Sequence, residues 1–190
     1  MSSASLDRVA ELRALAHPAR LDLLDLFRVH DRLTAAECAR ALGTSTKSCS
    51  YHLGILARGG LVAQVAQLSG DGRERPWRRV ADEFAVPAHP GGGGDRARVM
   101  RVAAQRDHDL FAGFVDREAA EPDQWRDSVT VHARTAVMSA DQLREWGEAV
   151  EAVTREHVRR ARRQPSQHRR PVRLLIRGFP QELAPEHASD

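Results

Sequence analysis

The segment TKSCSYHLGILARGG, residues 46–60, decides the fold that we predict for this chain. Cys49, Leu53 and Leu56 recur in it at helical spacing, so one face of a helix is expected to be buried. The opposite face carries six polar or aromatic side chains without an acidic one: Thr46, Lys47, Ser48, Ser50, Tyr51 and His52. Such side chains hydrogen-bond phosphate oxygens and base edges, so this face is typical of a helix that contacts duplex DNA.

A shorter helix is predicted just before this segment, at residues 35–42. Its inner face is expected to consist of Ala36, Ala39 and Leu42. Gly43 ends it, because glycine adopts the left-handed turn conformation at little cost. Thr44 or Ser45 can then cap the next helix. The two helices with their tight connection form a helix-turn-helix.

A β-hairpin is predicted directly after Gly60. Residues 61–66 alternate as a strand does, residues 69–72 read Ser-Gly-Asp-Gly, which is turn chemistry, and residues 76–80 return. Arginines crowd the loop and the return strand: Arg73, Arg75, Arg78 and Arg79. An isolated hairpin of this kind is usually a solvated loop. Directly behind a helix with a DNA-contacting face, it indicates the wing of a winged helix-turn-helix.

Two apolar helices are predicted before the helix-turn-helix. The first covers residues 5–14, and its apolar positions lie at helical spacing: Leu6, Val9, Leu12 and Leu15. The second begins at Pro18, where the missing backbone N–H costs nothing, and it has a wide apolar face. We interpret His17 as a structural residue, either a local cap of this helix or a satisfied side chain. Leu33 is expected to add a short strand beside the wing.

These features resemble the ArsR-type family of bacterial winged helix-turn-helix regulators, over about residues 12–80. The resemblance rests on LRALAHPARLDLLDLF at residues 12–27, on TAAECARALGTS at residues 34–45, and on Gly-Leu-Val at residues 60–62. It also includes four residues of the recognition helix: Ser50, His52, Leu53 and Leu56. The Ala-His-Pro-x-Arg opening at residues 16–20 is its most specific part.

The resemblance implies a homodimeric, sequence-specific DNA-binding transcription regulator, and a repressor rather than an activator. In the family, the first helix helps to form the dimer, and His52 is the residue most similar to a DNA contact. We predict that a double-stranded DNA operator is bound by Thr46, Lys47, Ser48, Ser50, Tyr51, His52, Arg73 and Arg75.

The chain changes character after residue 80. We predict a winged helix-turn-helix domain at residues 1–86, a linker at 87–94, a C-terminal module at 95–179 and a disordered tail at 180–190. Pro-Ala-His-Pro followed by four glycines marks the linker. Periodicity predicts helix, strand, helix and strand for the module, at residues 95–119, 128–137, 140–163 and 172–176. The fold class is mainly α (α+β), with a small helical α/β module after the winged domain.

A two-stranded sheet with helices on one face hides little apolar surface by itself. The module is therefore expected to dock on the winged domain, to pair with a second copy, or to receive a ligand, and the sequence leaves these alternatives open. Trp125, Val131 and Trp146 are the residues expected to line the pocket of a small-molecule effector.

A metal-responsive repressor is an alternative function, tested against the family's ligand positions. Metal-responsive members use a Cys-x-Cys pair, and those positions are Thr34 and Ala36 here, which offer no thiolate. Other members use Asp and His on the long helix after the wing, where this chain has Asp107, His108 and Asp109. A second histidine cluster is missing, so we predict no metal site and expect both aspartates on the solvated side.

Other classes of function find less support. The nine histidines lack the spacing of a catalytic motif, so we predict neither an enzyme nor a cofactor. A winged-helix adaptor that binds protein is the alternative of another class, but Tyr51 is the one aromatic residue on the exposed face. Cys38 and Cys49, the only cysteines, fall on apolar helix faces and are expected to be small buried hydrophobes.

Charge and hydropathy add two expectations. The formal net charge is +3, and the single lysine, Lys47, lies on the predicted DNA face. The sequence contains no run of about 18 apolar residues and does not begin like a signal peptide. We therefore expect a cytoplasmic protein without a membrane partner.

Overall fold

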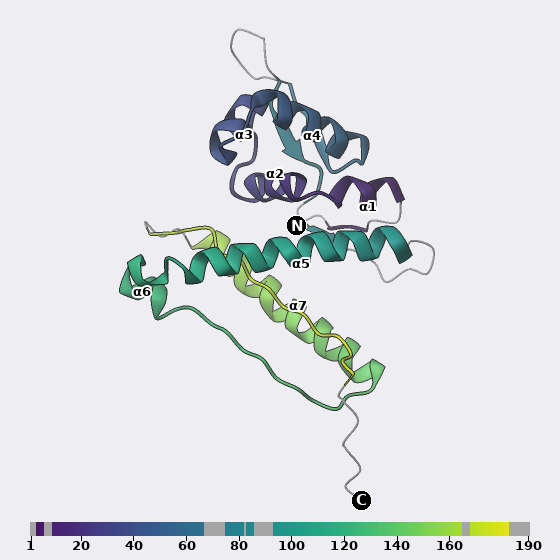
Figure 1. Ribbon diagram of the computed structural model, residues 1–190, viewed down its shortest axis with the longest axis vertical. Coiled ribbons are helices and arrows are strands. Elements are labelled where there is room, and N and C mark those ends of the chain that lie inside the picture. The colour runs from purple at the N-terminus through teal and green to yellow at the C-terminus, as the bar shows by residue number, and fades with distance from the viewer. Residues whose placement is uncertain are drawn as a thin grey trace, which may run out of the picture. The chain divides into compact units, whose positions relative to one another are not determined.

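The computed structural model describes residues 3–5, 9–66, 75–81, 83–85, 93–164 and 168–182. The chain divides into two compact units, Met1–Glu121 and Pro122–Asp190, whose elements are labelled in Figure 1. No helix in the described ranges is long and apolar enough to span a membrane.

The first unit contains the predicted helix-turn-helix and its hairpin. Its elements are α1 (Val9–Leu15), α2 (Pro18–Val29), α3 (Ala35–Leu42), α4 (Thr46–Arg58), β2 (Val62–Gln64), β3 (Trp77–Arg79), α5 (Gly93–Val115) and a 3₁₀ turn at Glu118–Ala120. Strands β2 and β3 pair antiparallel, with Val62 opposite Arg79, and Leu33 bridges to Trp77 as expected. The mainly helical fold with a winged helix-turn-helix is therefore confirmed.

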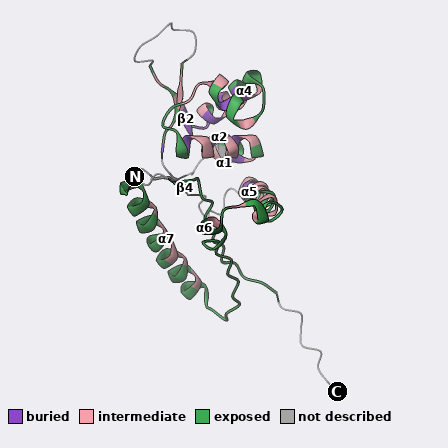
Figure 2. Cartoon of the chain, turned by 90° about the vertical axis from the view of Figure 1, so that its left-hand side faces the viewer, coloured by how far each residue is buried: buried purple, intermediate pink, exposed green. Residues whose placement is uncertain are grey.

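The core of this unit lies where the helical spacing predicted it. Cys49, Leu53 and Leu56 of α4 are buried against Leu23 of α2 and Leu61, and Figure 2 shows the buried residues concentrated in this part of the chain. The inner face of α3 differs slightly, because Ala35, Cys38 and Ala39 are buried whereas Ala36 and Leu42 are only partly so.

Local capping fixes the ends of α3 and α4. Thr34 and Glu37 form a capping box, in which each side chain accepts a hydrogen bond from the other residue's backbone N–H. Gly43 ends α3 with φ of 63°, a left-handed conformation that favours glycine. Ser45, rather than Thr44, caps α4 by accepting a hydrogen bond from the Ser48 N–H at 3.1 Å.

The start of the chain departs from the prediction of a helix at residues 5–14. Strand β1 (Ser3–Ser5) pairs in parallel with β4 (Glu83–Ala85), and α1 begins at Val9. Residue 5 is extended because its backbone pairs with Ala85, a long-range contact that helical periodicity does not report. The predicted turn at 69–72 and most of the linker at 87–94 lie outside the described residues.

Helix α5 belongs to the first unit, although the prediction put the domain boundary before it. Val99 is buried in the core of this unit, and two sets of ion pairs hold the helix. Arg13 of α1 pairs with Asp95 at 3.0 Å. Arg106 pairs with Asp22 at 2.7 Å and with Asp25 at 2.8 Å, both in α2.

The second unit contains α6 (Asp123–Arg126) and α7 (Ala140–Arg163). Helix α7 starts with the expected capping box between Ser139 and Gln142. The predicted strands at 128–137 and 172–176 are wrong for this single chain: residues 129–139 and 169–182 have no regular secondary structure. A strand needs a neighbour for its backbone N–H and C=O groups, and the described part of this unit provides none. The predicted tail is described only at 180–182, also without regular structure.

Candidate nucleic-acid interface

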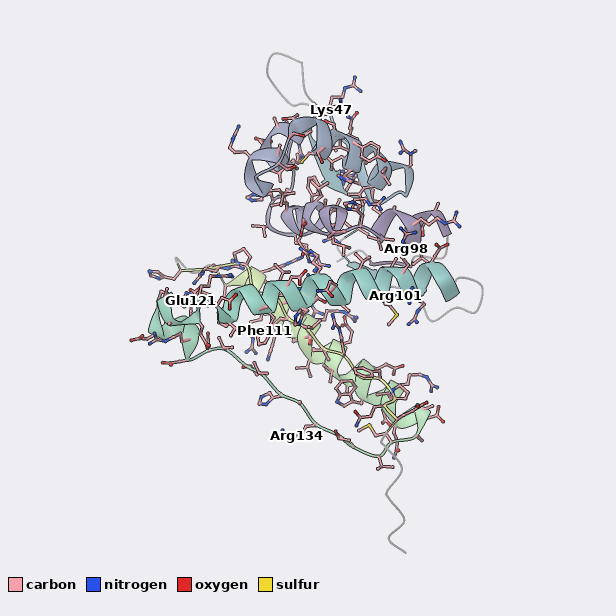
Figure 3. All side chains as sticks on the ribbon, viewed as in Figure 1. Lys47, Arg98, Arg101, Phe111, Glu121 and Arg134 are labelled. Carbon is pink, nitrogen blue, oxygen red and sulfur yellow. The ribbon has the colours of Figure 1, made fainter. Side chains whose placement is uncertain are left out.

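The start of α4 places the predicted contact face on the surface. Thr46, Lys47 and Ser50 are exposed, Tyr51 is 65% exposed, and Ser48 is partly exposed. Figure 3 shows Lys47 at the edge of the first unit that lies away from α5. The first turn of α4 contains no acidic residue, and the N-terminal end of a helix attracts anions. This surface is suited to a phosphate backbone.

His52 is partly buried, as Ser48 is, and its ring lies among other side chains. Its ring packs against that of His17, with centroids 4.6 Å apart and the ring planes tilted by 40°, and it meets Tyr51 edge to face at 5.2 Å. The Nδ1 atom of His52 is buried and has no hydrogen-bond partner among the described residues. His52 therefore offers only part of its ring to a ligand, and its packing helps to fix the position of Tyr51.

His17 has one of the two roles predicted for it, that of a local cap. Its Nδ1 accepts a hydrogen bond from the Ala19 N–H at 3.2 Å at the start of α2. Burial lowers the pKa of His17, and the nearby Arg20 guanidinium lowers it further, while Asp22 opposes them. Burial also lowers the pKa of His52, with His17 and Arg20 adding to the effect. The lowered pKa values favour the neutral form of both imidazoles, the form in which His17 Nδ1 can accept its hydrogen bond.

Arg20 is a buried cation near Tyr51 and His52, and the sequence pattern did not predict its burial. It is 9% exposed, and its Nε has no hydrogen-bond partner in the described part of the chain. Burial lowers its pKa, and so does the positive charge of Arg98, whereas Tyr51 raises it. Arg20 is the arginine of the Ala-His-Pro-x-Arg opening, and this motif could have drawn attention to it. Helical periodicity gave no reason to expect that its side chain is buried.

The wing of the same unit contributes exposed cations. Arg75 is exposed, as predicted, and Arg78 on β3 is also exposed. The exposure of Arg78 follows from strand alternation: successive side chains point to opposite faces, and its neighbours Trp77 and Arg79 are partly buried. Arg73 lies outside the described residues.

Of the three residues predicted to line an effector pocket, Trp146 borders the hollow found in the described part of the second unit. The volume of this hollow is about 230 Å³, and Leu143, Val150, Ile176 and Gly178 also line it. Trp125 instead has the Arg170 guanidinium 5.1 Å from its ring centroid, and Val131 is 67% exposed. Ile176 and Gly178 were missed, because nothing in the sequence placed residues 168–182 along α7.

The residues considered as metal ligands have other environments. Cys38 and Cys49 are free thiols in the core, which confirms the prediction, and burial raises the pKa of Cys38 to about 12. Asp107 is 5% exposed, so its predicted place on the solvated side of α5 is wrong. His108 and Asp109 are exposed. The described residues contain no group of three or more His, Cys, Asp or Glu able to hold a metal ion.

The comparisons with known proteins support the class that this geometry defines. Residues 15–65 match a family described as a helix-turn-helix domain, a range that includes α2, α3, α4 and β2. No characterised protein matches the chain. The chain therefore carries a helix-turn-helix domain, and such a domain suggests a DNA-binding transcription regulator rather than an enzyme.

Proposed function

We propose that this chain is an ArsR-type regulator that binds a double-stranded operator as a homodimer and represses transcription. The observation that supports the proposal most is the exposed, acid-free start of α4, in a unit whose wing carries the exposed cations Arg75 and Arg78. Lys47 and Ser48 are suited to phosphates, while Ser50 and Tyr51 reach outward toward base edges. His52 remains one of the proposed DNA contacts, but we expect it to contribute less to binding because part of its ring is buried.

A dimer is supported by the apolar side chains that α5 leaves exposed: Met100, Leu110, Phe111 and Val115. Phe111 is labelled on this helix in Figure 3. A two-fold pairing that covers them would bring two recognition helices to successive major grooves, about 34 Å apart. Arg73 and Arg75 of each wing would then meet flanking phosphates or the minor groove.

The test is selection of bound fragments from random duplex DNA, followed by salt titration of two variants on the selected site. Arg75→Ala is expected to weaken binding to all sequences about equally and to reduce the salt slope by about one ion. Tyr51→Ala is expected to change which sequences are selected. Arg101→Ala, an exposed arginine on α5, is the control. If Arg75→Ala and Tyr51→Ala both bind like the parent, the proposed contact face is wrong.

We also propose that a small-molecule effector acts through the C-terminal module, at the hollow beside Trp146. An effector changes DNA affinity only if it binds two dimer geometries with different affinity. A thermal-shift screen of small metabolites on the parent and on Trp146→Ala tests this. A compound that stabilises both chains equally, or no stabilising compound at all, would favour a constitutive regulator.

A further inference from the structure

The described residues of the second unit form no buried core. Every described residue from 122 to 182 is exposed or only partly buried, and Figure 2 shows α7 without a buried residue along its length. Eleven large apolar side chains in this range are exposed: Val129, Val131, Val137, Met138, Trp146, Val153, Val172, Leu174, Leu175, Ile176 and Phe179. A soluble surface rarely carries so many apolar groups close together unless something covers them.

The first irregular segment of this unit leaves most of its backbone unpaired. Among the described residues, one backbone–backbone hydrogen bond involves 129–138, from the Val129 N–H to the Arg126 carbonyl. Residues 129–137 nevertheless alternate as a strand does, with Val129, Val131 and Val137 on one side. An open strand edge and a bare apolar face occur here in the same segment.

The two segments differ in how they meet α7. Residues 168–182 pack on the helix: a Cβ added to Gly178 would lie 2.5 Å from the Trp146 ring, so no side chain fits there. Residues 127–139 diverge from α7 in Figure 1. Among the described residues, the two segments share one side-chain hydrogen bond, from Gln181 Nε2 to Thr135 Oγ1 at 3.4 Å. The alternating segment is thus attached at one end and uncovered along the rest.

A second copy of the chain fits this surface best. Nine extended residues form a strip about 30 Å long, more than a small molecule covers. Full burial of one large apolar side chain contributes 1.5–3 kcal/mol at about 25 cal/mol per Å², which corresponds to roughly 60–120 Å² of apolar area. Because these eleven side chains are only about half exposed, together they offer roughly 500 Å² of apolar area per chain. A standard interface buries about 800 Å² per partner, somewhat more than half of it apolar.

The alternation itself suits a two-fold axis. If two copies of 129–137 lie antiparallel across such an axis at Ala133, each odd-numbered residue faces another odd-numbered residue. The apolar side chains of both copies then lie on one side of the shared sheet, which makes the surface self-complementary. The polar side, with His132 and Arg134, faces away from them.

We propose that the second unit is completed by a second copy of this chain, with residues 129–137 of each chain forming a strand in a sheet shared by both. The inference rests on the proposed homodimer and specifies how the C-terminal halves of its two chains pair. It does not depend on DNA binding. The strands predicted from the sequence would then exist in the dimer and not in one chain.

The test uses an equal mixture of ¹⁴N- and ¹⁵N-labelled full-length Val131→Cys, carrying a photo-activated benzophenone on the new thiol. Cys38 and Cys49 are buried and stay unmodified. We expect cross-linked peptides that join light and heavy chains, with both ends in residues 122–182. Thr130→Cys, on the opposite side of the segment, is the matched control and should give several-fold fewer such products.

Cross-links confined to one chain, or ending in the first unit, would overturn the proposal. Hydrogen exchange of the unmodified protein provides a second measurement, free of any folding defect in the variants. Protected amides at 130–136 are expected, and fast exchange throughout would also overturn the proposal. Duplex binding by the parent is measured separately: a chain that cross-links as expected but binds no DNA refutes the regulator and leaves the shared sheet standing.

Discussion

Replacing Arg106 by methionine should loosen α5 from α2. The Arg106 side chain is 10% exposed, its Nε lies 2.7 Å from Asp22 Oδ1, and its Nη2 lies 2.8 Å from Asp25 Oδ2. A hydrogen bond to a charged group contributes about 1.5–3 kcal/mol. The two carboxylates are 38% and 30% exposed, so water screens them, and we expect a total loss of about 2–3 kcal/mol in the free energy of unfolding.

Urea denaturation followed by circular dichroism measures this loss. Methionine keeps the length of the aliphatic stem, so the variant removes charge and hydrogen bonds with little change in packing. Arg101→Met is the control, since Arg101 is exposed on the same helix, and it should change stability by less than about 0.5 kcal/mol. A double-mutant cycle with Asp22→Asn isolates one pair. Equal stability of the Arg106 and Arg101 variants would refute the assigned attachment of α5.

Four further changes have defined outcomes. Gly43→Ala places a Cβ in the left-handed region at φ of 63° and should cost about 1–2 kcal/mol in thermal unfolding, and no loss would contradict the turn geometry. Thr34→Ala removes the capping box of α3 and should cost about 1 kcal/mol, with Thr34→Ser restoring most of it. The lowered pKa values of His17 and His52 mean that the unfolded chain binds more protons below about pH 6.5, so stability should fall as the pH drops through that range and stay level above it. His52→Gln should flatten this profile in urea titrations at several pH values, and an unchanged profile would remove the histidine pair as its cause. The Cys38 thiol, with its pKa raised to about 12, should resist iodoacetamide at pH 8 until the chain is denatured, as mass spectrometry would show.

The helix-turn-helix was predictable because its signals are local. The spacing of Cys49, Leu53 and Leu56 identified the buried face of α4, and Gly43 marked the turn before it. The same reasoning placed Tyr51 on the outside, because a residue is exposed when the apolar positions of its helix face the other way. The ends and faces of these helices follow from residues within one or two turns of each other.

The burial of His52 and Asp107 was not predictable in the same way. The partial burial of His52 involves a contact distant in the sequence, with His17 at the start of α2, and Asp107 is 5% exposed although it is charged. For a polar residue next to an apolar stripe, helical periodicity does not determine whether the side chain is buried, because one position corresponds to about 100° of rotation around the helix. Tertiary contacts determine whether it is buried or exposed.

The strands show where pattern reasoning fails for a physical reason. A helix satisfies its own backbone hydrogen bonds, so an amphipathic sequence such as α7 forms one even without a buried face. A strand satisfies none of its own backbone hydrogen bonds. The alternation in residues 129–137 therefore predicts both a neighbouring strand at its edge and a partner that covers its apolar side chains, such as Val131. In a single chain neither need is met among the described residues, and the segment stays irregular. The pattern is therefore evidence about a partner rather than about the chain alone, and the same alternation that gave a wrong strand gives the reason to look for the second copy.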